Sequence, residues 1–352
     1  MRAIYWNLTD RCNLRCKHCY LQDILASPSE PLSHELNTQD CLKIVNQFEE
    51  AKVFFVTVLG GEPFCRPDIM VILRHLGKKK FWTKITTNGT LIDENTARDL
   101  ADAGIRGLFV SLEGPSAEVN DIIRGKGSFE KTIKGISYLQ DFDIPFNIQM
   151  TIFKVNYEKI EEMADFCSRI GAERVVFESF NDFPSKDQVS SFLSLGREDT
   201  LAAAQKTTEL MAEYPEGFIS TDLDSVLGFL SPEPDPAAKD KTFVRCDLGL
   251  TQLGILSNGD VIPCIYMRDK VLGNLMETHL SEIPNTPEVQ KIKDLRNITV
   301  DEANEECSLC KWRYVCGGGC RGRAYLKYGN LLSPDPQRCL LVKKRTSQVN
   351  QG

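Results

Sequence analysis

The stretch Cys12-Asn13-Leu14-Arg15-Cys16-Lys17-His18-Cys19 carries three cysteines within eight positions and follows closely on the apolar segment 4–9. That segment is typical of a short strand, which places the cysteines on the loop behind its carboxyl end. Three thiolates can hold three irons of a [4Fe–4S] cluster and leave the fourth iron open to a ligand that is not protein. The alternative is a zinc site completed by His18 or a distant residue.

Beyond this loop, segments typical of strands alternate with segments typical of helices. Strands are predicted at 4–9, 53–59, 82–87, 108–112, 146–152 and 174–178, and helices at 38–50, 68–76, 94–103, 129–140 and 157–170. Such alternation implies parallel strands with right-handed crossovers. Six strands are too few for a closed eight-stranded barrel, so we expect an α/β fold with a partial (β/α)6 TIM-like barrel. Its functional loops should follow the carboxyl ends of the strands.

The chain divides into three predicted parts. Residues 1–180 form the barrel, residues 181–243 form a connecting region with a helix near 198–212, and residues 244–352 form a small C-terminal domain. The segment 231–240 is rich in proline and charge, which is typical of a mobile loop or a domain boundary. From Cys246 onward, periodicity gives way to glycine, proline and seven cysteines. Metal rather than an apolar core usually organises such a segment.

Composition narrows the class of protein further. The 352 residues are 42% hydrophobic and 26% charged, with a net charge of −7, which is typical of a globular protein and unlike a nucleic-acid-binding surface. The longest apolar run, 53–59, is too short to cross a membrane, and the N-terminus does not resemble a signal peptide. We therefore expect a cytoplasmic protein. Its 13 cysteines against 4 histidines then indicate metal or redox chemistry rather than disulfides.

The motif at 12–19 resembles the signature of the radical S-adenosylmethionine (SAM) superfamily, with His18 in a slot that is commonly aromatic. The resemblance implies that Cys12, Cys16 and Cys19 hold a [4Fe–4S] cluster whose open iron binds SAM. In the family, an electron from this cluster cleaves SAM to methionine and a 5′-deoxyadenosyl radical, which removes hydrogen from a substrate. A reducing partner of the flavodoxin or ferredoxin type is implied as well.

The loops behind the later strands agree with this resemblance. Residues 60–63 match the GGEP motif of the family, and Glu62 offers a carboxylate to the SAM ammonium group. The resemblance also places Arg124 opposite the methionine carboxylate. The full predicted SAM-binding set is Gly60, Gly61, Glu62, Pro63, Asn88, Ser111, Glu113 and Arg124. Taken singly, such residues are equally typical of turns, strand caps and surface ion pairs.

The C-terminal cysteine spacing resembles the SPASM extension of radical SAM enzymes. The resemblance implies two auxiliary [4Fe–4S] clusters, the first bound by Cys246, Cys264 and Cys320 and the second by Cys307, Cys310, Cys316 and Cys339. Residues 235–245 contain no cysteine, so the first auxiliary cluster is expected to have an open iron or a ligand other than cysteine. A zinc ribbon at Cys307, Cys310, Cys316 and Cys320 is the alternative. Cys41, Cys65 and Cys167 are expected to be small buried apolar residues.

The SPASM resemblance favours a peptide or protein substrate that undergoes post-translational modification, as in ribosomal peptide maturases. The second hypothesis is oxidation or rearrangement of a small molecule or tetrapyrrole in haem or quinone cofactor biosynthesis. A hypothesis of another class is a non-catalytic iron–sulfur electron carrier. Sulfatase maturases have an acidic residue directly after the second cysteine of the extension, and Ile265 at that position counts against their activity.

Substrate contacts follow from position in the chain. Glu178 ends the sixth predicted strand and is the expected acid–base residue, with a rim ion pair as its alternative role. Tyr266 and Asp182 are also expected to face the substrate. Because Cys12 lies so near Met1, we expect no recognition domain fused ahead of the barrel. A peptide would then be held by the barrel and the extension, or by a separate adaptor.

Overall fold

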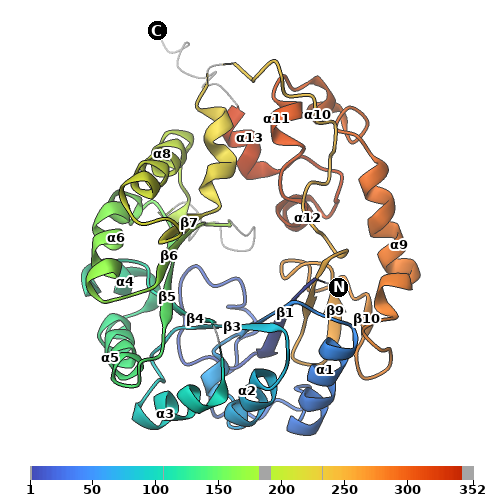
Figure 1. The fold of residues 1–352 in the computed structure, drawn as a ribbon. Coiled ribbons are helices and arrows are strands. Elements are labelled where there is room, and N and C mark those ends of the chain that lie inside the picture. The colour runs from blue at the N-terminus through green and yellow to red at the C-terminus, as the bar shows by residue number, and fades with distance from the viewer. Residues whose placement is uncertain (1, 106, 182–191, 232, 343–352) are drawn as a thin grey trace.

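The computed structural model describes residues 2–105, 107–181, 192–231 and 233–342. Within them, one sheet has the strand order β10-β9-β8-β1-β2-β3-β4-β5-β6-β7. Its middle strands all run parallel and form the open barrel that the sequence predicts, with helices on its outer side (Figure 1). They are β1 (Ala3–Thr9), β2 (Phe55–Gly60), β3 (Trp82–Thr87), β4 (Gly107–Ser111), β5 (Phe146–Ile152) and β6 (Arg174–Ser179).

The crossover helices lie close to their predicted positions. They are α1 (Thr38–Glu50), α2 (Ile69–Gly77), α3 (Glu94–Ala103), α5 (Ser128–Asp141), α6 (Ile160–Arg169) and, after β6, α8 (Arg197–Glu213). Local capping explains where two of them begin: the Asn37 side chain accepts from Asp40 N ahead of α1, and Asp93 accepts from Thr96 N ahead of α3. Within the barrel, α4 (Ala117–Arg124) was not predicted, because its eight residues give too short a periodic pattern.

The two faces of the barrel sheet differ in chemistry. On β1, Ile4, Trp6 and Leu8 are buried toward the helices, and Trp6 packs edge-on against Phe48 of α1 with ring centroids 5.5 Å apart. The opposite face carries residues such as Tyr5, which line a cavity. Parallel sheets are usually apolar on both faces. A polar inner face that lines a cavity therefore indicates a binding site rather than a packed core.

Strands from the two later parts of the chain extend this sheet. From the predicted connecting region, β7 (Ile219–Thr221) pairs in parallel with β6, and from the C-terminal part, β8 (Gln252–Ile255) pairs in parallel with β1. The antiparallel strands β9 (Asp260–Ile262) and β10 (Gly273–Asn274) follow. These strands are too short to be visible as a sequence pattern. The described sheet therefore contains strands from the predicted barrel, the connecting region and the C-terminal domain.

The C-terminal part consists of short helices and irregular turns, which in Figure 1 lie across the open side of the barrel. Gly317, Gly318 and Gly319 all have positive φ, a backbone conformation that glycine adopts without strain. No helix among the described residues is long and apolar enough to span a membrane. The short helices are α9 (Pro287–Asp294), α10 (Glu305–Leu309), α11 (Arg313–Cys316), α12 (Arg321–Tyr328) and α13 (Pro336–Val342), and the 3-10 turns are η1 (Pro63–Cys65), η2 (Tyr157–Lys159), η4 (Leu223–Phe229), η5 (Ile283–Asn285) and η6 (Leu295–Asn297).

Candidate active site

A central cavity of about 430 Å³ lies at the carboxyl ends of the barrel strands and extends into the barrel. Its size lies within the usual range of small-ligand sites, roughly 300–1,000 Å³. Residues from the cysteine loop, from β1 to β6 and from the C-terminal part all contribute to its wall. Among the residues predicted from sequence, the lining includes Cys12, Cys16, Cys19, Gly60, Gly61, Glu62, Asn88, Ser111, Arg124, Glu178 and Tyr266.

The three cysteines of the first loop share one wall of this cavity. Cys12 and Cys16 are buried and Cys19 is half-buried. Burial raises the pKa of the Cys12 thiol to about 12 and that of Cys16 to about 11. Since the thiolate is the form that binds metal, a bound cation must supply the stabilisation that water cannot. These three cysteines line one cavity and are near enough to influence one another's pKa, so the chemistry of the set fits an iron–sulfur cluster that faces the cavity.

The paired glycines of the GGEP loop allow it to pack directly against the cysteine loop. A Cβ on Gly60, which has φ of +144°, would lie 2.4 Å from the carbonyl oxygen of Thr9, and one on Gly61 would lie 2.1 Å from that of Arg11. Both positions therefore require glycine because two backbones meet there. The nearest neighbours of both glycines are the end of β1 and the start of the cysteine loop. Pro63 is buried and begins η1.

Glu62 is held in place by three donors at the edge of the cavity. Its carboxylate accepts from Thr87 Oγ1 at 2.7 Å, Asn88 N at 2.7 Å and Phe64 N at 3.2 Å, and the residue is 1% exposed. Burial raises the pKa of Glu62, and these hydrogen bonds oppose that rise. Such a fixed, poorly solvated carboxylate is suited to bind an ammonium group.

Asn88 connects the end of β3 to the cluster loop. Its Nδ2 donates to Asn13 Oδ1 at 2.9 Å, while its Oδ1 accepts from Thr90 N at 2.9 Å. Ser111 ends β4 and lines the same cavity. Asn88 thus contacts the cysteine loop, and Ser111 lines the cavity that this loop borders.

Arg124 and Glu113 form a buried ion pair. Arg124 Nη2 lies 2.6 Å from Glu113 Oε1, and the two side chains are 8% and 0% exposed. Glu113 also accepts from Thr151 N at 2.8 Å. Because arginine has five N–H donors, the pair leaves Arg124 with capacity for a ligand in the cavity. The predicted direct role of Glu113 in SAM binding stays a prediction, since its visible role is to position Arg124.

The inner face of the sheet carries two polar residues, Lys84 and Gln149, that were not predicted from the sequence. Lys84 of β3 lines the cavity, with its Nζ 3.7 Å from the centroid of the Phe109 ring. On β5, Gln149 Nε2 donates to Glu178 Oε2 at 2.6 Å. Burial lowers the pKa of Lys84 and raises that of Glu178, and the attraction between the two charges opposes both shifts. A lysine in the middle of a parallel strand was the available sequence signal, because such strands are otherwise apolar.

Tyr266 borders the cavity from the C-terminal part. Its ring packs edge-on against Tyr20 at 5.9 Å between centroids, and its hydroxyl accepts from Asn181 Nδ2 at 2.8 Å. Burial, followed by the nearby Cys264 thiol, raises the pKa of Tyr266 well above its usual value, so the phenol is neutral. Asp182, also expected near the substrate, lies outside the described residues.

The C-terminal cysteines separate into the two predicted sets. Four of them line a single cavity of about 240 Å³, namely Cys307, Cys310, Cys316 and Cys339. Cys246, Cys264 and Cys320 are grouped apart: burial and, to a smaller extent, the other two thiols together raise the pKa of Cys264 to about 12. The zinc-ribbon alternative would require Cys320, and not Cys339, to line this cavity together with Cys307, Cys310 and Cys316. Among the described residues, no three His, Cys, Asp or Glu side chains converge closely enough to hold one metal ion.

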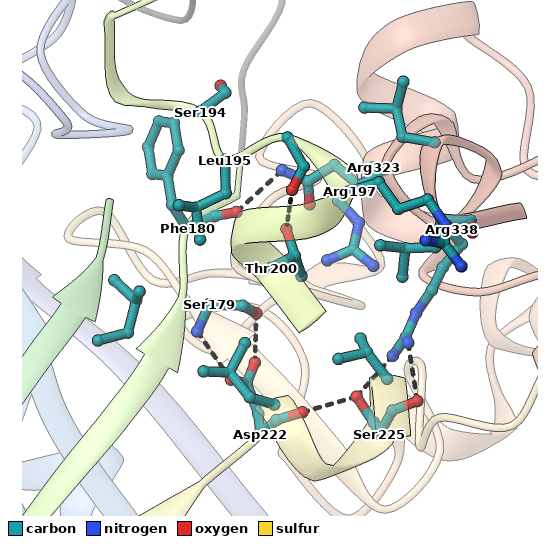
Figure 2. Close-up of a pocket in the computed structure, with 17 residues that line it drawn as sticks. Ser179, Phe180, Ser194, Leu195, Arg197, Thr200, Asp222, Ser225, Arg323 and Arg338 are labelled. Atoms are coloured by element: carbon teal, nitrogen blue, oxygen red, sulfur yellow. Dashed lines mark hydrogen bonds between the residues drawn. The ribbon is translucent and has the colours of Figure 1, made fainter. Parts of the chain in front are cut away.

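A smaller side cavity of about 110 Å³ adjoins the central one and is drawn in Figure 2. The two cavities share Ser179, Phe180 and Asp222 in their linings. Asp222 accepts from both the backbone nitrogen and the hydroxyl of Ser179, at 2.7 and 2.6 Å. On the opposite wall lie Arg323 and Arg338 of the C-terminal part (Figure 2).

An open parallel barrel with three cysteines, a glycine loop and a buried carboxylate at its rim defines a class of iron–sulfur enzymes that bind a small ligand beside the cluster. The chain belongs to the radical SAM superfamily. Residues 6–167 match the model of that superfamily, and residues 246–311 match the SPASM model, described as an iron–sulfur cluster-binding domain. The predicted family, fold class and enzymatic nature are confirmed.

The relatives act on different substrates. The chain is 34% identical over 343 residues to the mycofactocin maturase MftC of Mycolicibacterium smegmatis, covering 95% of this chain and 82% of that one. It is 30% identical over 345 residues to the AdoMet-dependent heme synthase of Methanosarcina barkeri, covering 95% of each. The fold is similar to that of Streptococcus suis SuiB bound to the precursor peptide SuiA, with a TM-score of 0.76 and 22% identity over 97% of this chain and 76% of that chain.

Proposed function

We propose that this radical SAM enzyme modifies a peptide, one residue of which enters the central cavity. The observation that carries the proposal is the pair of adjoining cavities, of about 430 and 110 Å³, with three lining residues in common. The larger one must hold SAM as well as the reacting group, which leaves space for about one side chain. An extended peptide can place one residue there and a neighbouring residue in the side cavity.

The charges of the central cavity also favour a peptide over a tetrapyrrole of haem biosynthesis. Beyond the residues proposed to bind SAM, the lining contains one lysine, Lys84, against two carboxylates, Glu178 and Asp222. Tetrapyrroles of that pathway carry several carboxylates, which require several cationic partners. A neutral peptide segment has no such requirement.

Each part of the cavity then has a proposed role. Cys12, Cys16 and Cys19 would hold the cluster that, with SAM, supplies the hydrogen-abstracting radical. Glu62, Asn88, Ser111 and Arg124 would orient SAM beside it, and Glu178 would accept or donate a proton at the substrate. The two C-terminal cysteine sets would hold two further [4Fe–4S] clusters, making three in the chain, and a flavodoxin- or ferredoxin-type protein would reduce them in the cytoplasm. Peptide recognition by the cavities or by a separate adaptor is part of the same proposal.

Synthesis of haem is the second candidate, because the heme synthase of Methanosarcina barkeri matches this chain over 95% of both lengths. One experiment separates the two. The reconstituted protein is incubated anaerobically with SAM and dithionite, and with either a library of short synthetic peptides or iron coproporphyrin III. We expect 5′-deoxyadenosine and a change of peptide mass in the first reaction only. Stimulation by the tetrapyrrole alone would overturn the proposal.

A further inference from the structure

A buried arginine lies where the two C-terminal cysteine sets meet. Cys316 of the second set and Cys320 of the first are separated only by three glycines, and Arg321 follows directly. The Arg321 guanidinium donates to the carbonyl oxygen of Gly318 and, through Nε, to that of Gly319 at 3.4 Å. The residue is 0% exposed. Its side chain therefore contacts the backbone that joins one cysteine set to the other.

The surroundings of Arg321 hold its guanidinium in one orientation. Arg321 Nη1 also donates to the carbonyl oxygens of Leu331 and Ser333 at 2.7 Å each. The guanidinium carbon lies 4.2 Å from the centroid of the Phe243 ring. A Cβ on Gly318 would lie 2.3 Å from Cε2 of that ring and 3.1 Å from Arg321 Nη2, so this packing requires glycine.

The charge of Arg321 has no carboxylate partner within the described residues. Its hydrogen bonds there all go to carbonyl oxygens, and the nearby Asp335 is paired with Arg323 at 2.6 Å. Burying a charge without an ion pair is costly, because little water remains to stabilise it. An anionic group close by would supply that stabilisation, and a [4Fe–4S] cluster with its thiolates is anionic.

Thiols of both sets lie close enough to Arg321 to respond to its charge. Burial lowers the pKa of Arg321, and a nearby carboxylate and three thiols oppose this fall, namely Cys307, Cys320 and Cys316. Burial also raises the pKa of Cys246 and that of Cys307, and the Arg321 charge opposes both rises. Cys246 and Cys320 belong to the first set, and Cys307 and Cys316 belong to the second. One cation therefore acts on both sets.

We propose that Arg321 is an electrostatic residue shared by the two auxiliary clusters, and that its buried positive charge raises the reduction potential of both. The inference rests on the proposed function, since it requires the clusters assigned there to the C-terminal cysteines. An added electron makes a cluster more negative, so a fixed cation in a medium of low dielectric favours the reduced form. The cluster loop at 12–19 has a different cation near Cys16, which is Arg124, and its cluster should not respond to Arg321.

Three substitutions separate the charge of Arg321 from its hydrogen bonds. Arg321→Gln removes the charge and keeps N–H groups for the carbonyl oxygens. Arg321→Lys keeps a charge with fewer donors, and the negative groups around it keep the lysine protonated. The matched control is Arg174→Gln, because Arg174 Nε also donates to a carbonyl oxygen, that of Gly217 at 2.8 Å, but at an exposed position on the barrel.

The test is a redox titration of the full, cluster-loaded chain. Each variant is reconstituted anaerobically, its iron is counted, and its clusters are titrated with dithionite and followed by electron paramagnetic resonance. The radical SAM cluster is assigned by the change of its signal when SAM is added. We expect the ratio of reduced to oxidised auxiliary cluster at one fixed potential to fall at least about tenfold in Arg321→Gln, which is about 59 mV for a one-electron couple. Arg321→Lys, Arg174→Gln and the SAM-responsive signal should match the wild type.

An unshifted potential in Arg321→Gln, or an equal shift in Arg321→Lys, would overturn the inference. Loss of iron from either variant would show that Arg321 holds the clusters in place rather than tuning them, and would overturn it as well. The wild-type spectrum tests the proposed function separately. If it shows only the SAM-responsive signal, the proposed auxiliary clusters fail, whereas auxiliary signals that do not shift in Arg321→Gln overturn the inference alone.

Discussion

The barrel and the C-terminal part of this protein are stabilised in different ways. In the barrel, parallel strands and amphipathic helices bury apolar side chains such as Ile4, Trp6 and Phe48. The C-terminal part has helices of only four to eight residues, and its segment 305–342 buries few apolar side chains, namely Trp312, Ala324 and Leu341. Arg321 is fully buried there, donates to the carbonyl oxygens of Leu331 and Ser333 at 2.7 Å each, and lies over the Phe243 ring.

This difference indicates that metal is needed for folding in the C-terminal part and for chemistry in the barrel. Regular elements with a shared apolar core are stable without the cysteine loop that they carry at their rim. Short helices between cysteines have little core of their own, so their arrangement depends on what the thiols bind. Four predictions test this comparison, beginning with the largest expected effect.

Replacing Cys12, Cys16 and Cys19 together with Ala removes the three proposed protein ligands of the radical SAM cluster. We expect 5′-deoxyadenosine formation to fall to background, and iron to fall by about four from about twelve atoms per chain. The far-UV circular dichroism spectrum should be unchanged, because these residues lie on a loop outside the helices and the strands of the sheet. Retention of SAM cleavage in this variant, measured by chromatography, would contradict the assignment of the site.

Anaerobic removal of iron with a chelator should affect the two regions unequally. Amide hydrogen exchange, followed by mass spectrometry, should accelerate by at least about tenfold in residues 305–342 and little in β1 to β6. The physical reason is that the C-terminal thiols lose the ion that holds them together. Equal acceleration in both regions would show that the barrel depends on iron as well.

Glu113→Ala leaves Arg124 buried without its partner. We expect a loss of about 3–5 kcal/mol in the free energy of unfolding. The matched control is Glu94→Ala, which breaks the exposed pair of Glu94 and Arg98, with side chains 64% and 54% exposed, and should cost about 0.5 kcal/mol or less. Denaturant midpoints of the cluster-loaded variants measure both. Similar losses in the two variants would mean that the Glu113 pair contributes no more than a surface pair.

Lys84→Met should shift the pH dependence of peptide modification. Burial raises the pKa of Glu178 and the Lys84 charge lowers it, so removing that charge raises the pKa of Glu178 further. If ionised Glu178 is the required form, the acidic limb of the kcat profile moves to higher pH. The control Lys43→Met removes an exposed charge paired with Asp40 on α1 and should leave the profile in place. An acidic limb that stays in place in Lys84→Met would contradict the proton-transfer role of Glu178.

Much of the fold was predictable because its signals are local. Strand and helix periods placed β3, β5, α1 and α3 at their observed bounds. The strands β7, β8 and β9 were not predicted, because three or four residues carry no measurable period and their pairing partners lie far away in the sequence. The site followed the same rule: motif residues such as Glu62 were found from spacing, whereas Lys84 and Gln149 became candidates only when the inner face of the sheet was known.

The sequence by itself determined the chemistry that this protein carries. The resemblance of the cysteine motifs and the GGEP loop to known motifs predicted a radical SAM enzyme with a SPASM domain, because ligands on one loop lie close together in the sequence as well as in space. Only the tertiary structure decided which groups face one another. The pairing of Glu113 with Arg124 and the hydrogen bond from Asn181 to Tyr266 join residues that the sequence separates. Side-chain direction and hydrogen-bond polarity arise from packing in three dimensions, and no local pattern encodes them.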